Sequence, residues 1–112
     1  MRGVFAFDVS IIGDGKADDY LPIECNPRHN GASYPSGIAC KLGLHAWVAK
    51  EFHTRHTRLA DIDLQGIEFD PVAGSGIIIV NWGTVLVGKQ SLVIAGTEAQ
   101  QNELDKALVE RL

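Results

Sequence analysis

The sequence predicts an α+β fold: an antiparallel hairpin with covering helices, followed by a small antiparallel meander and a C-terminal helix. Three observations support this class. Apolar side chains alternate with a period of two over 3–12 and 20–26, which is typical of strands that bury one face. They recur with helical spacing over 44–53. In the second half, glycines separate short apolar runs, which is typical of a meander.

Composition limits the classes of protein to which the chain can belong. It has 112 residues, 46% of them hydrophobic, and a net charge of −4. This is too apolar for a disordered acidic chain, and the acidic balance argues against a general nucleic-acid binder. The N-terminus lacks the regions of a signal peptide, and no apolar run approaches the about 20 residues of a membrane-spanning helix. Two cysteines do not make a disulfide framework, so we expect a cytoplasmic protein. The length predicts one domain, or two small lobes that share a core.

The hairpin consists of residues 3–12 and 20–26. In the first segment the odd positions hold large apolar side chains, and the even positions are smaller and more polar. The second segment is again apolar at odd positions, among them Cys25, whose thiol we expect to be buried and inert. Pro22 cannot donate a hydrogen bond to a sheet, so this strand is expected to lie at an edge.

The parity of these positions constrains the register of the hairpin. Directly opposite residues of an antiparallel pair share a face. A two-residue turn at 14–15 would place Asp8 opposite Leu21 and would bury one apolar set on the wrong face. The two apolar faces coincide if Asp8 lies opposite Glu24. We therefore expect a longer turn, at about 14–18, or a bulge.

Two helices are expected after the hairpin. The first begins near Pro35 or Ser36 and runs to Leu42, and Gly43 follows as its C-cap. The second spans about 44–53, because side chains suited to one helix face recur there at intervals of three and four. The residues with this spacing are Leu44, Trp47, Val48, Glu51 and Phe52.

The polar segment 53–63 is expected to be a surface connector. It contains two histidines three residues apart, His53 and His56, followed by Asp61 and Asp63. These four could form a metal site, because imidazole and carboxylate groups are common metal ligands. The flanking arginines and the polar surroundings favour a solvated or substrate-facing loop instead.

The second half is expected to form the meander and the last helix. A turn runs from Asp70 to Gly76. Thr97 to Gln100 has the pattern of a capping box, in which two side chains satisfy each other's backbone N–H groups at the start of a helix. The expected strands are 67–69, 77–81, 84–87 and 92–95, and the apolar stripe of the helix is Leu104, Leu108 and Leu112.

Asp8, Glu24 and Asn26 are the candidate metal ligands of the sequence. Glu24 and Asn26 are two residues apart on a strand, so both side chains point to one face, and Asp8 joins them if it lies opposite Glu24. Carboxylate and amide oxygens are hard ligands that suit Mg²⁺ or Mn²⁺. Arg28 follows and can offer a planar, always charged fork to a phosphate. The alternative is a solvated sheet face on which Arg28 pairs with Glu24.

These residues belong to a longer pattern. Gly-Val-Phe-Ala-Phe-Asp-Val at 3–9 precedes Leu-Pro-Ile-Glu-Cys-Asn-Pro-Arg at 21–28, and Gly-Ala-Ser at 31–33 and Gly-Ile-Ala at 37–39 follow. Over 3–43 this order resembles the end of an ATP-grasp module, in which an acidic strand precedes an E-x-N-P-R strand. The resemblance implies an ATP-dependent carboxylate–amine ligase, in which ATP phosphorylates a carboxylate and an amine displaces the phosphate.

The resemblance also implies roles for individual residues. Asp8, Glu24 and Asn26 would hold Mg²⁺, or Mn²⁺, on the phosphates of ATP. Arg28 would contact a phosphate or the acyl-phosphate intermediate, as both a cofactor-binding and a catalytic residue. The implied cofactors are therefore the metal ion and ATP, and the implied substrates are a carboxylate and an amine.

Residues 66–97 resemble the small C-terminal lobe that follows the ATP-grasp module in pheganomycin-type peptide ligases. The resemblance divides the chain into the C-terminal part of an ATP-grasp subdomain, 1–54, and a lobe of meander plus helix, 55–112. ATP-grasp enzymes also need an upstream subdomain with the adenine pocket, which this sequence does not contain. We therefore expect a C-terminal fragment that is inactive alone: an excised piece, a truncated reading frame or one half of a split enzyme.

A second class of function stays open: a non-catalytic α+β binding or interaction module, in which Asp8 and Glu24 are surface charges and no metal binds. In either class the apolar face of the hairpin needs a cover. If the helices at 35–53 do not cover it, we expect a homodimer through that face or through a strand edge. No nucleic-acid or membrane partner is expected.

Overall fold

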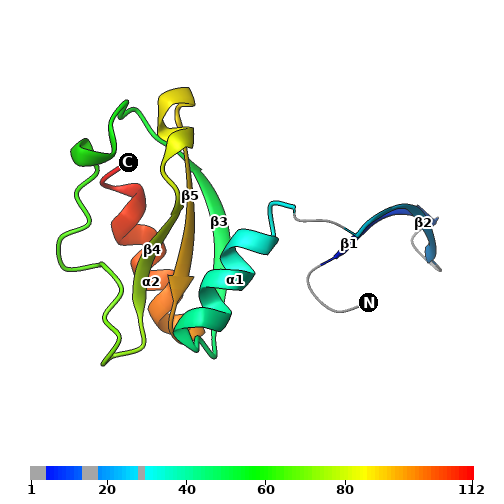
Figure 1. The fold of residues 1–112 in the computed structure, drawn as a ribbon, viewed down its shortest axis with the longest axis horizontal. Coiled ribbons are helices and arrows are strands. Elements are labelled where there is room, and N and C mark those ends of the chain that lie inside the picture. The colour runs from blue at the N-terminus through cyan, green and yellow to red at the C-terminus, as the bar shows by residue number, and fades with distance from the viewer. Residues whose placement is uncertain (1–4, 14–17, 28–29) are drawn as a thin grey trace.

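The computed structural model describes residues 5–13, 18–27 and 30–112, and most of the turn expected at 14–18 lies outside them. The fold is α+β with two antiparallel sheets and two α-helices, as the sequence predicts at this level (Figure 1). No helix in the described ranges is long and apolar enough to cross a membrane. The elements are β1 (Ala6–Gly13), β2 (Asp18–Asn26), α1 (Ser33–Leu42), β3 (Trp47–His53), η1 (Leu59–Asp61), β4 (Gly76–Asn81), η2 (Gly83–Val87), β5 (Lys89–Ala95) and α2 (Glu98–Val109), where η marks a 3₁₀ helix.

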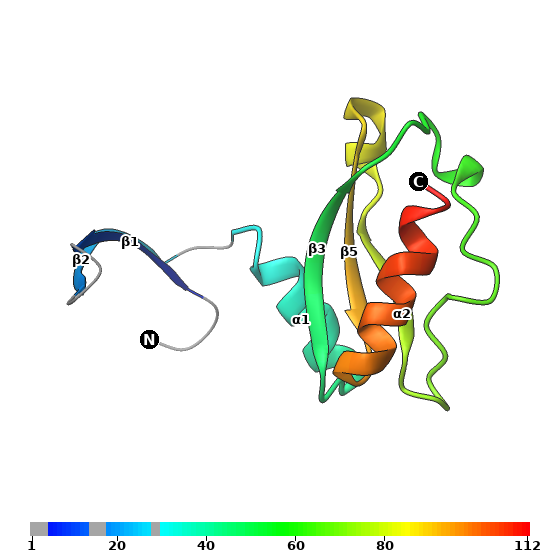
Figure 2. The ribbon, with the colours of Figure 1, turned by 180° about the vertical axis from the view of Figure 1, so that it is seen from behind.

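The larger sheet has three strands in the order β3-β5-β4, and all neighbours are antiparallel. α1 lies over one face and α2 over the other, so β5 is central both in the sheet and between the layers (Figures 1 and 2). Residues 92–95 of β5 are at most 1% exposed. A strand covered on both faces needs a continuous apolar run rather than an alternating one, and Leu-Val-Ile-Ala supplies it. β3 and β5 lie on either side of the division expected at residue 54, and they pair within this one sheet.

α2 provides the main helical contribution to the core. The expected capping box is present: the Thr97 side chain accepts from the backbone N–H of Gln100, and the Gln100 side chain accepts from the backbone N–H of Thr97. Leu108, from the expected stripe, is fully buried. Its cluster contains Ile67, Ile77 and Leu92, and Leu104 and Leu112 pack against it.

α1 confirms the first expected helix. It ends at Leu42, and Gly43 follows in the left-handed region with φ of 65°, which glycine adopts without steric cost. The helix begins at Ser33, two residues before the earlier of the expected starts at Pro35. Asn30 accounts for this difference, because its backbone N–H donates to the Ser33 hydroxyl at 2.9 Å and its carbonyl accepts from the Ser33 N–H at 3.0 Å.

The second expected helix, at about 44–53, is wrong. Residues 47–53 form β3 and pair with β5 along the whole strand. The helical spacing of apolar residues there is also compatible with a strand, because Trp47, Val48 and Phe52 are aromatic or β-branched. The partners in β5 lie far along the chain, so this long-range pairing outweighs the local preference.

Two expected strands of the meander are also wrong. Residues 84–87 belong to the 3₁₀ helix η2, because β4 and β5 are direct neighbours and the chain between them serves as their connection. Residues 67–69 contribute one isolated bridge, between Glu68 and Ile77, in place of a strand. The strands expected at 77–81 and 92–95 are confirmed as parts of β4 and β5.

β1 and β2 form a separate two-stranded sheet that projects from the rest of the fold (Figures 1 and 2). The radius of gyration is 16.6 Å, whereas a compact chain of this length has about 13 Å. The expectation that the segment 35–53 covers the hairpin is wrong, because α1 packs on the larger sheet and β3 belongs to it. The large apolar side chains of the hairpin therefore stay between 47% and 69% exposed.

The core assignment predicts that Leu108→Ala lowers the free energy of unfolding by about 2–5 kcal/mol, because it removes buried methyl groups and leaves a cavity. Chemical denaturation followed by circular dichroism measures the change. Val109→Ala is the matched control, since Val109 belongs to the same helix and is 59% exposed. It should change the free energy by no more than about 0.5 kcal/mol. Equal losses in the two variants would contradict the position of the core.

Candidate functional site

Asp8 and Glu24 are directly opposite each other in the hairpin, as the parity of the strands predicts. A β-bulge between Asp8 and Val9 produces this register, because it shifts the pairing by one residue at that point. Asn26, two residues after Glu24, donates from Nδ2 to Oδ2 of Asp8 at 3.4 Å. The structure thus places three of the expected site residues on one face of the two-stranded sheet.

The bulge gives the two halves of the hairpin different parity. At the open end of the hairpin, away from the turn, Cys25 pairs with Phe7 and shares the apolar face with it, as expected. On the side of the turn, Leu21 pairs with Ser10, so its expected place on the apolar face is wrong. The reason is that Ile23 is the extra residue of the bulge and displaces the residues nearer the turn to the opposite face. Cys25 is exposed rather than buried, because the described part of the chain leaves this face uncovered.

The two facing carboxylates repel each other. Side chains directly opposite in an antiparallel pair have Cβ atoms about 4.5–5.5 Å apart, and unit charges about 4 Å apart repel by about 1 kcal/mol in water. Asp8 and Glu24 are both exposed, so the solvent value applies. The Asn26 amide offsets part of the negative charge of Asp8. A cation between the two carboxylates would remove the remaining repulsion and stabilise the paired hairpin.

The chemistry of these donors fits Mg²⁺. Asp8, Glu24 and Asn26 offer up to three oxygen ligands, and Mg²⁺ commonly completes its shell with water and phosphate oxygens. The nitrogen of the Asn26 amide faces Asp8, so the amide has to rotate before its oxygen can contribute. Within the described ranges, no group of three or more His, Cys, Asp or Glu side chains is arranged to hold a metal ion. Asp8, Glu24 and Asn26 are not such a group, because they supply only two carboxylates, together with one amide.

Arg28 and His29 lie outside the described residues. Their neighbour Asn30 has a structural role, because its side-chain oxygen accepts from the backbone N–H of Ala32 at 3.0 Å. Its Nδ2 is buried and has no hydrogen-bond partner in the described part of the chain. Asn30 therefore orders the residues at the start of α1.

His53 and His56 do not combine with the nearby acids to form a metal site. His56 Nε2 donates to the backbone oxygen of Arg111 at 3.0 Å. The Arg111 guanidinium donates in turn to the backbone oxygens of Asp63 and Gln65, at 3.3 Å and 2.9 Å. These hydrogen bonds connect the segment 53–63 to the C-terminal end of the chain. They give the connector a structural role that the sequence does not reveal, because the partners are remote from each other along the chain.

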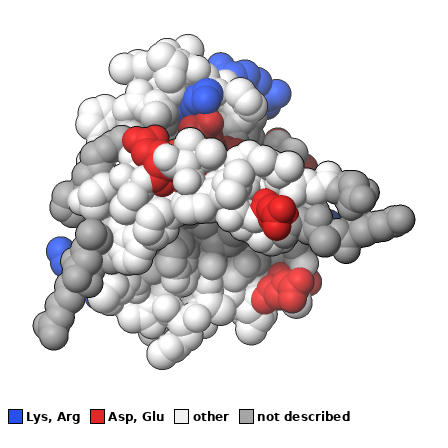
Figure 3. Space-filling view, turned by 90° about the vertical axis from the view of Figure 1, so that its right-hand side faces the viewer, with Lys and Arg blue, Asp and Glu red and all other residues white. Residues whose placement is uncertain are grey.

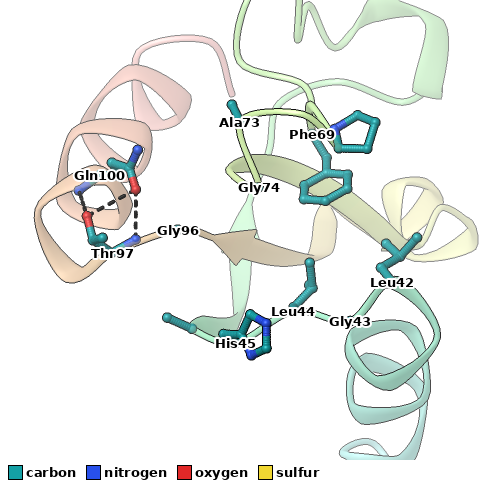
Figure 4. A pocket seen from close by; sticks show the side chains of 12 residues that line it. Leu42, Gly43, Leu44, His45, Phe69, Ala73, Gly74, Gly96, Thr97 and Gln100 are labelled. Carbon is teal, nitrogen blue, oxygen red and sulfur yellow. Dashed lines mark hydrogen bonds between the residues drawn. The ribbon is translucent and has the colours of Figure 1, made fainter.

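A cavity of about 450 Å³ lies in the body of the fold, between the end of α1, the turn before β4 and the start of α2 (Figure 4). Apolar side chains line much of it, and Thr97 and Gln100 lie on another side. Their side-chain oxygens are occupied by the capping box. His45 is the only titratable side chain among the described residues that line the cavity, so an acid–base pair is missing there. The sequence does not predict this cavity, since its lining comes from separate segments.

The end of the molecule that carries the hairpin is mostly uncharged (Figure 3). The acidic side chains visible on it are separate from one another, and basic side chains lie near the margin of the view. The described part of this face has no continuous basic patch of the kind that nucleic-acid-binding proteins use.

No protein-family model, curated protein or solved structure matches this chain. The resemblance to ATP-grasp ligases consequently rests on the sequence motifs at 3–43 and 66–97.

The contacts of the connector predict that His56→Ala lowers the free energy of unfolding by about 1 kcal/mol, because it removes a hydrogen bond to the C-terminal backbone. His53→Ala is the control and should change it by no more than about 0.5 kcal/mol, since that side chain is exposed. Thermal unfolding with and without Zn²⁺ completes the test. A Tm that rises with Zn²⁺ in the wild type, and not in His56→Ala, would identify a metal site in the connector and refute the structural role.

Proposed function

We propose that this chain supplies the Mg²⁺- and phosphate-binding part of an ATP-dependent carboxylate–amine ligase of the ATP-grasp type. One observation carries the proposal: Asp8 lies opposite Glu24, and Asn26 donates to Asp8 on the same exposed face. Carboxylate and amide oxygens on an open face are suitable ligands for Mg²⁺ when phosphate oxygens of the substrate complete its shell.

The proposed reaction has two displacement steps. A carboxylate oxygen of one substrate attacks the γ-phosphorus of ATP, the bond to the bridging oxygen breaks, and ADP leaves. An amine then attacks the acyl carbon of the acyl-phosphate, inorganic phosphate leaves, and the amine proton passes to solvent or to a base. Mg²⁺ would supply neutralisation of the phosphate charge. Asp8, Glu24 and Asn26 would hold the metal ion and would not transfer a proton.

Arg28 has the chemistry to contact the phosphoryl group that is transferred. It follows Asn26 by two residues, and its guanidinium stays charged and can donate two parallel hydrogen bonds to phosphate oxygens. Pro27, between them, has a fixed φ and thereby restricts the path from the metal-binding strand to Arg28. We therefore assign Arg28 to the γ-phosphate and to the acyl-phosphate.

The affinity of this chain for Mg²⁺ should be weak. The two carboxylates are exposed, so metal binding has to order side chains that solvent leaves free, and the protein offers at most three ligands. We expect dissociation constants in the millimolar range for the metal alone, and tighter binding when ATP supplies further oxygens.

Titration with Mn²⁺ in NMR experiments tests the proposal, because the ion broadens the resonances of nearby nuclei. The amides around Asp8 and Glu24 should broaden selectively. Asp8→Asn and Glu24→Gln should each weaken binding about tenfold, or about 1.4 kcal/mol, since each removes one charged ligand. Arg28→Ala should leave the Mn²⁺ affinity unchanged and weaken the binding of Mg·ATP.

Glu103→Gln is the matched control for Glu24→Gln. It removes the same charge from α2, and it should leave the metal affinity of the hairpin unchanged. If millimolar Mn²⁺ produces no selective broadening at Asp8 and Glu24 in the wild type, the ligase proposal fails. The remaining interpretation is then a non-catalytic interaction module in which both carboxylates are surface charges.

A further inference from the structure

The hairpin has a second face, opposite the carboxylates, that is apolar and uncovered in the described part of the chain. We call it the apolar hairpin face. On β1 it carries two phenylalanines in edge-to-face contact, with ring centroids 5.7 Å apart, and two aliphatic side chains. Its members are Phe5, Phe7, Val9 and Ile11, together with Tyr20, Pro22 and Cys25, which oppose Ile11, Val9 and Phe7 in the ladder.

The exposed area of this face is comparable to that of the largest apolar patches on monomeric proteins, which are often functional. Phe7 is 53% exposed, Ile11 62% and Tyr20 64%. Because an aromatic side chain removes about 150–250 Å² from water when fully buried, the face leaves on the order of 500 Å² of apolar surface open. That area lies in the upper part of the range of about 300–600 Å² for the largest patch on a monomer. Complete coverage of two such faces would bury about 1,000 Å², which lies at the threshold for a predicted interface and below the about 1,200–2,000 Å² of stable complexes, so we expect a weak dimer.

Charge does not oppose contact between two copies over most of this face. The acidic side chains Asp8, Asp19 and Glu24 all lie on the opposite face, according to the ladder. Between positions 5 and 12 of β1, neither β1 nor its ladder partners place a charged residue on the apolar hairpin face, and the next ladder pair toward the turn, Gly13 with Asp18, ends this uncharged stretch. Two acidic chains, each with a net charge of −4, can therefore approach here with their hairpin carboxylates directed outward and in solvent.

The architecture of the hairpin also favours packing of a second sheet on its apolar face over addition of a further strand at one of its edges. A two-stranded sheet is marginally stable alone and gains stability when an apolar layer packs on it. Pro22 and the bulge at Ile23 interrupt the β2 edge, which disfavours the addition of a strand there. Addition at the β1 edge would leave the apolar hairpin face still open to water. Face-to-face packing covers it directly.

We propose that the apolar hairpin face is the interface of a homodimer, in which the hairpins of two copies pack face to face across a two-fold axis. The contact is isologous, so Phe7 and Ile11 of one copy meet the same face of the other. The metal ligands of the proposed function lie on the outer faces of this pair. The two proposals depend on different side chains and on different experiments, so failure of one does not refute the other.

Sedimentation equilibrium of the wild-type chain and of two variants tests the dimer. The wild type should have twice the monomer mass at high concentration and dissociate on dilution. Ile11→Ser should weaken the dimer at least tenfold. Ile12→Ser is the matched control: Ile12 is the adjacent residue, is 57% exposed and lies on the opposite face. It should change the dissociation constant no more than twofold.

Thiol modification gives a second readout that does not depend on a variant in the interface. Cys25 lies on the apolar hairpin face and Cys40 lies on α1, and both are exposed in the single chain. In the Cys40→Ser variant, the rate at which a thiol reagent modifies Cys25 should fall as the protein concentration rises through the dissociation constant. In Cys25→Ser, the rate at Cys40 should not depend on concentration.

Three outcomes overturn the proposal. A wild-type chain that stays monomeric at millimolar concentration excludes the homodimer and leaves the face to a different polypeptide. A dimer that Ile11→Ser and Ile12→Ser weaken equally is held by another surface or by a strand edge. A modification rate at Cys25 that does not change with concentration shows that the face stays open in the associated state.

Discussion

Burial of β5 on both faces and along both edges is the constraint on which the body of the fold depends. Its last four residues are at most 1% exposed, so its backbone groups have no access to water and need partners on each side. β3 and β4 supply these partners, and α1 and α2 cover the two faces. The extended conformation of 47–53 follows from this requirement, even though the apolar spacing there also suits a helix.

The hairpin lacks a constraint of this kind. It contributes no strand to the larger sheet, and its shape is determined by its own ladder. The bulge beside Asp8 is consequently important, because it determines which side chains share a face. It places Glu24 opposite Asp8, and it moves Leu21 to the face that carries Ser10. The same irregularity thus creates the candidate metal site and interrupts the apolar face near the turn.

Sequence reasoning succeeded where the deciding interaction is local. Gly43 and Thr97 mark helix ends because a cap involves residues within one turn, and parity alone required Asp8 to oppose Glu24. It failed where the deciding partner is remote. β3 depends on β5, and the role of His56 depends on the C-terminal backbone. The cavity beside α2 could not be predicted for the same reason, since its walls come from segments that only the fold brings together.

The two proposed functions of the hairpin are linked through its stability. A two-stranded sheet with little support from the body is marginal, so the paired state competes with frayed states. A cation on the carboxylate face removes repulsion that only the paired state experiences. A second copy on the apolar hairpin face removes apolar surface that only the paired state presents as one continuous face. If both proposals hold, each ligand would therefore raise the fraction of chains that are competent to bind the other. The weak metal affinity that we propose and the open apolar face would then have the same physical origin, which is a hairpin that the body of the fold supports little.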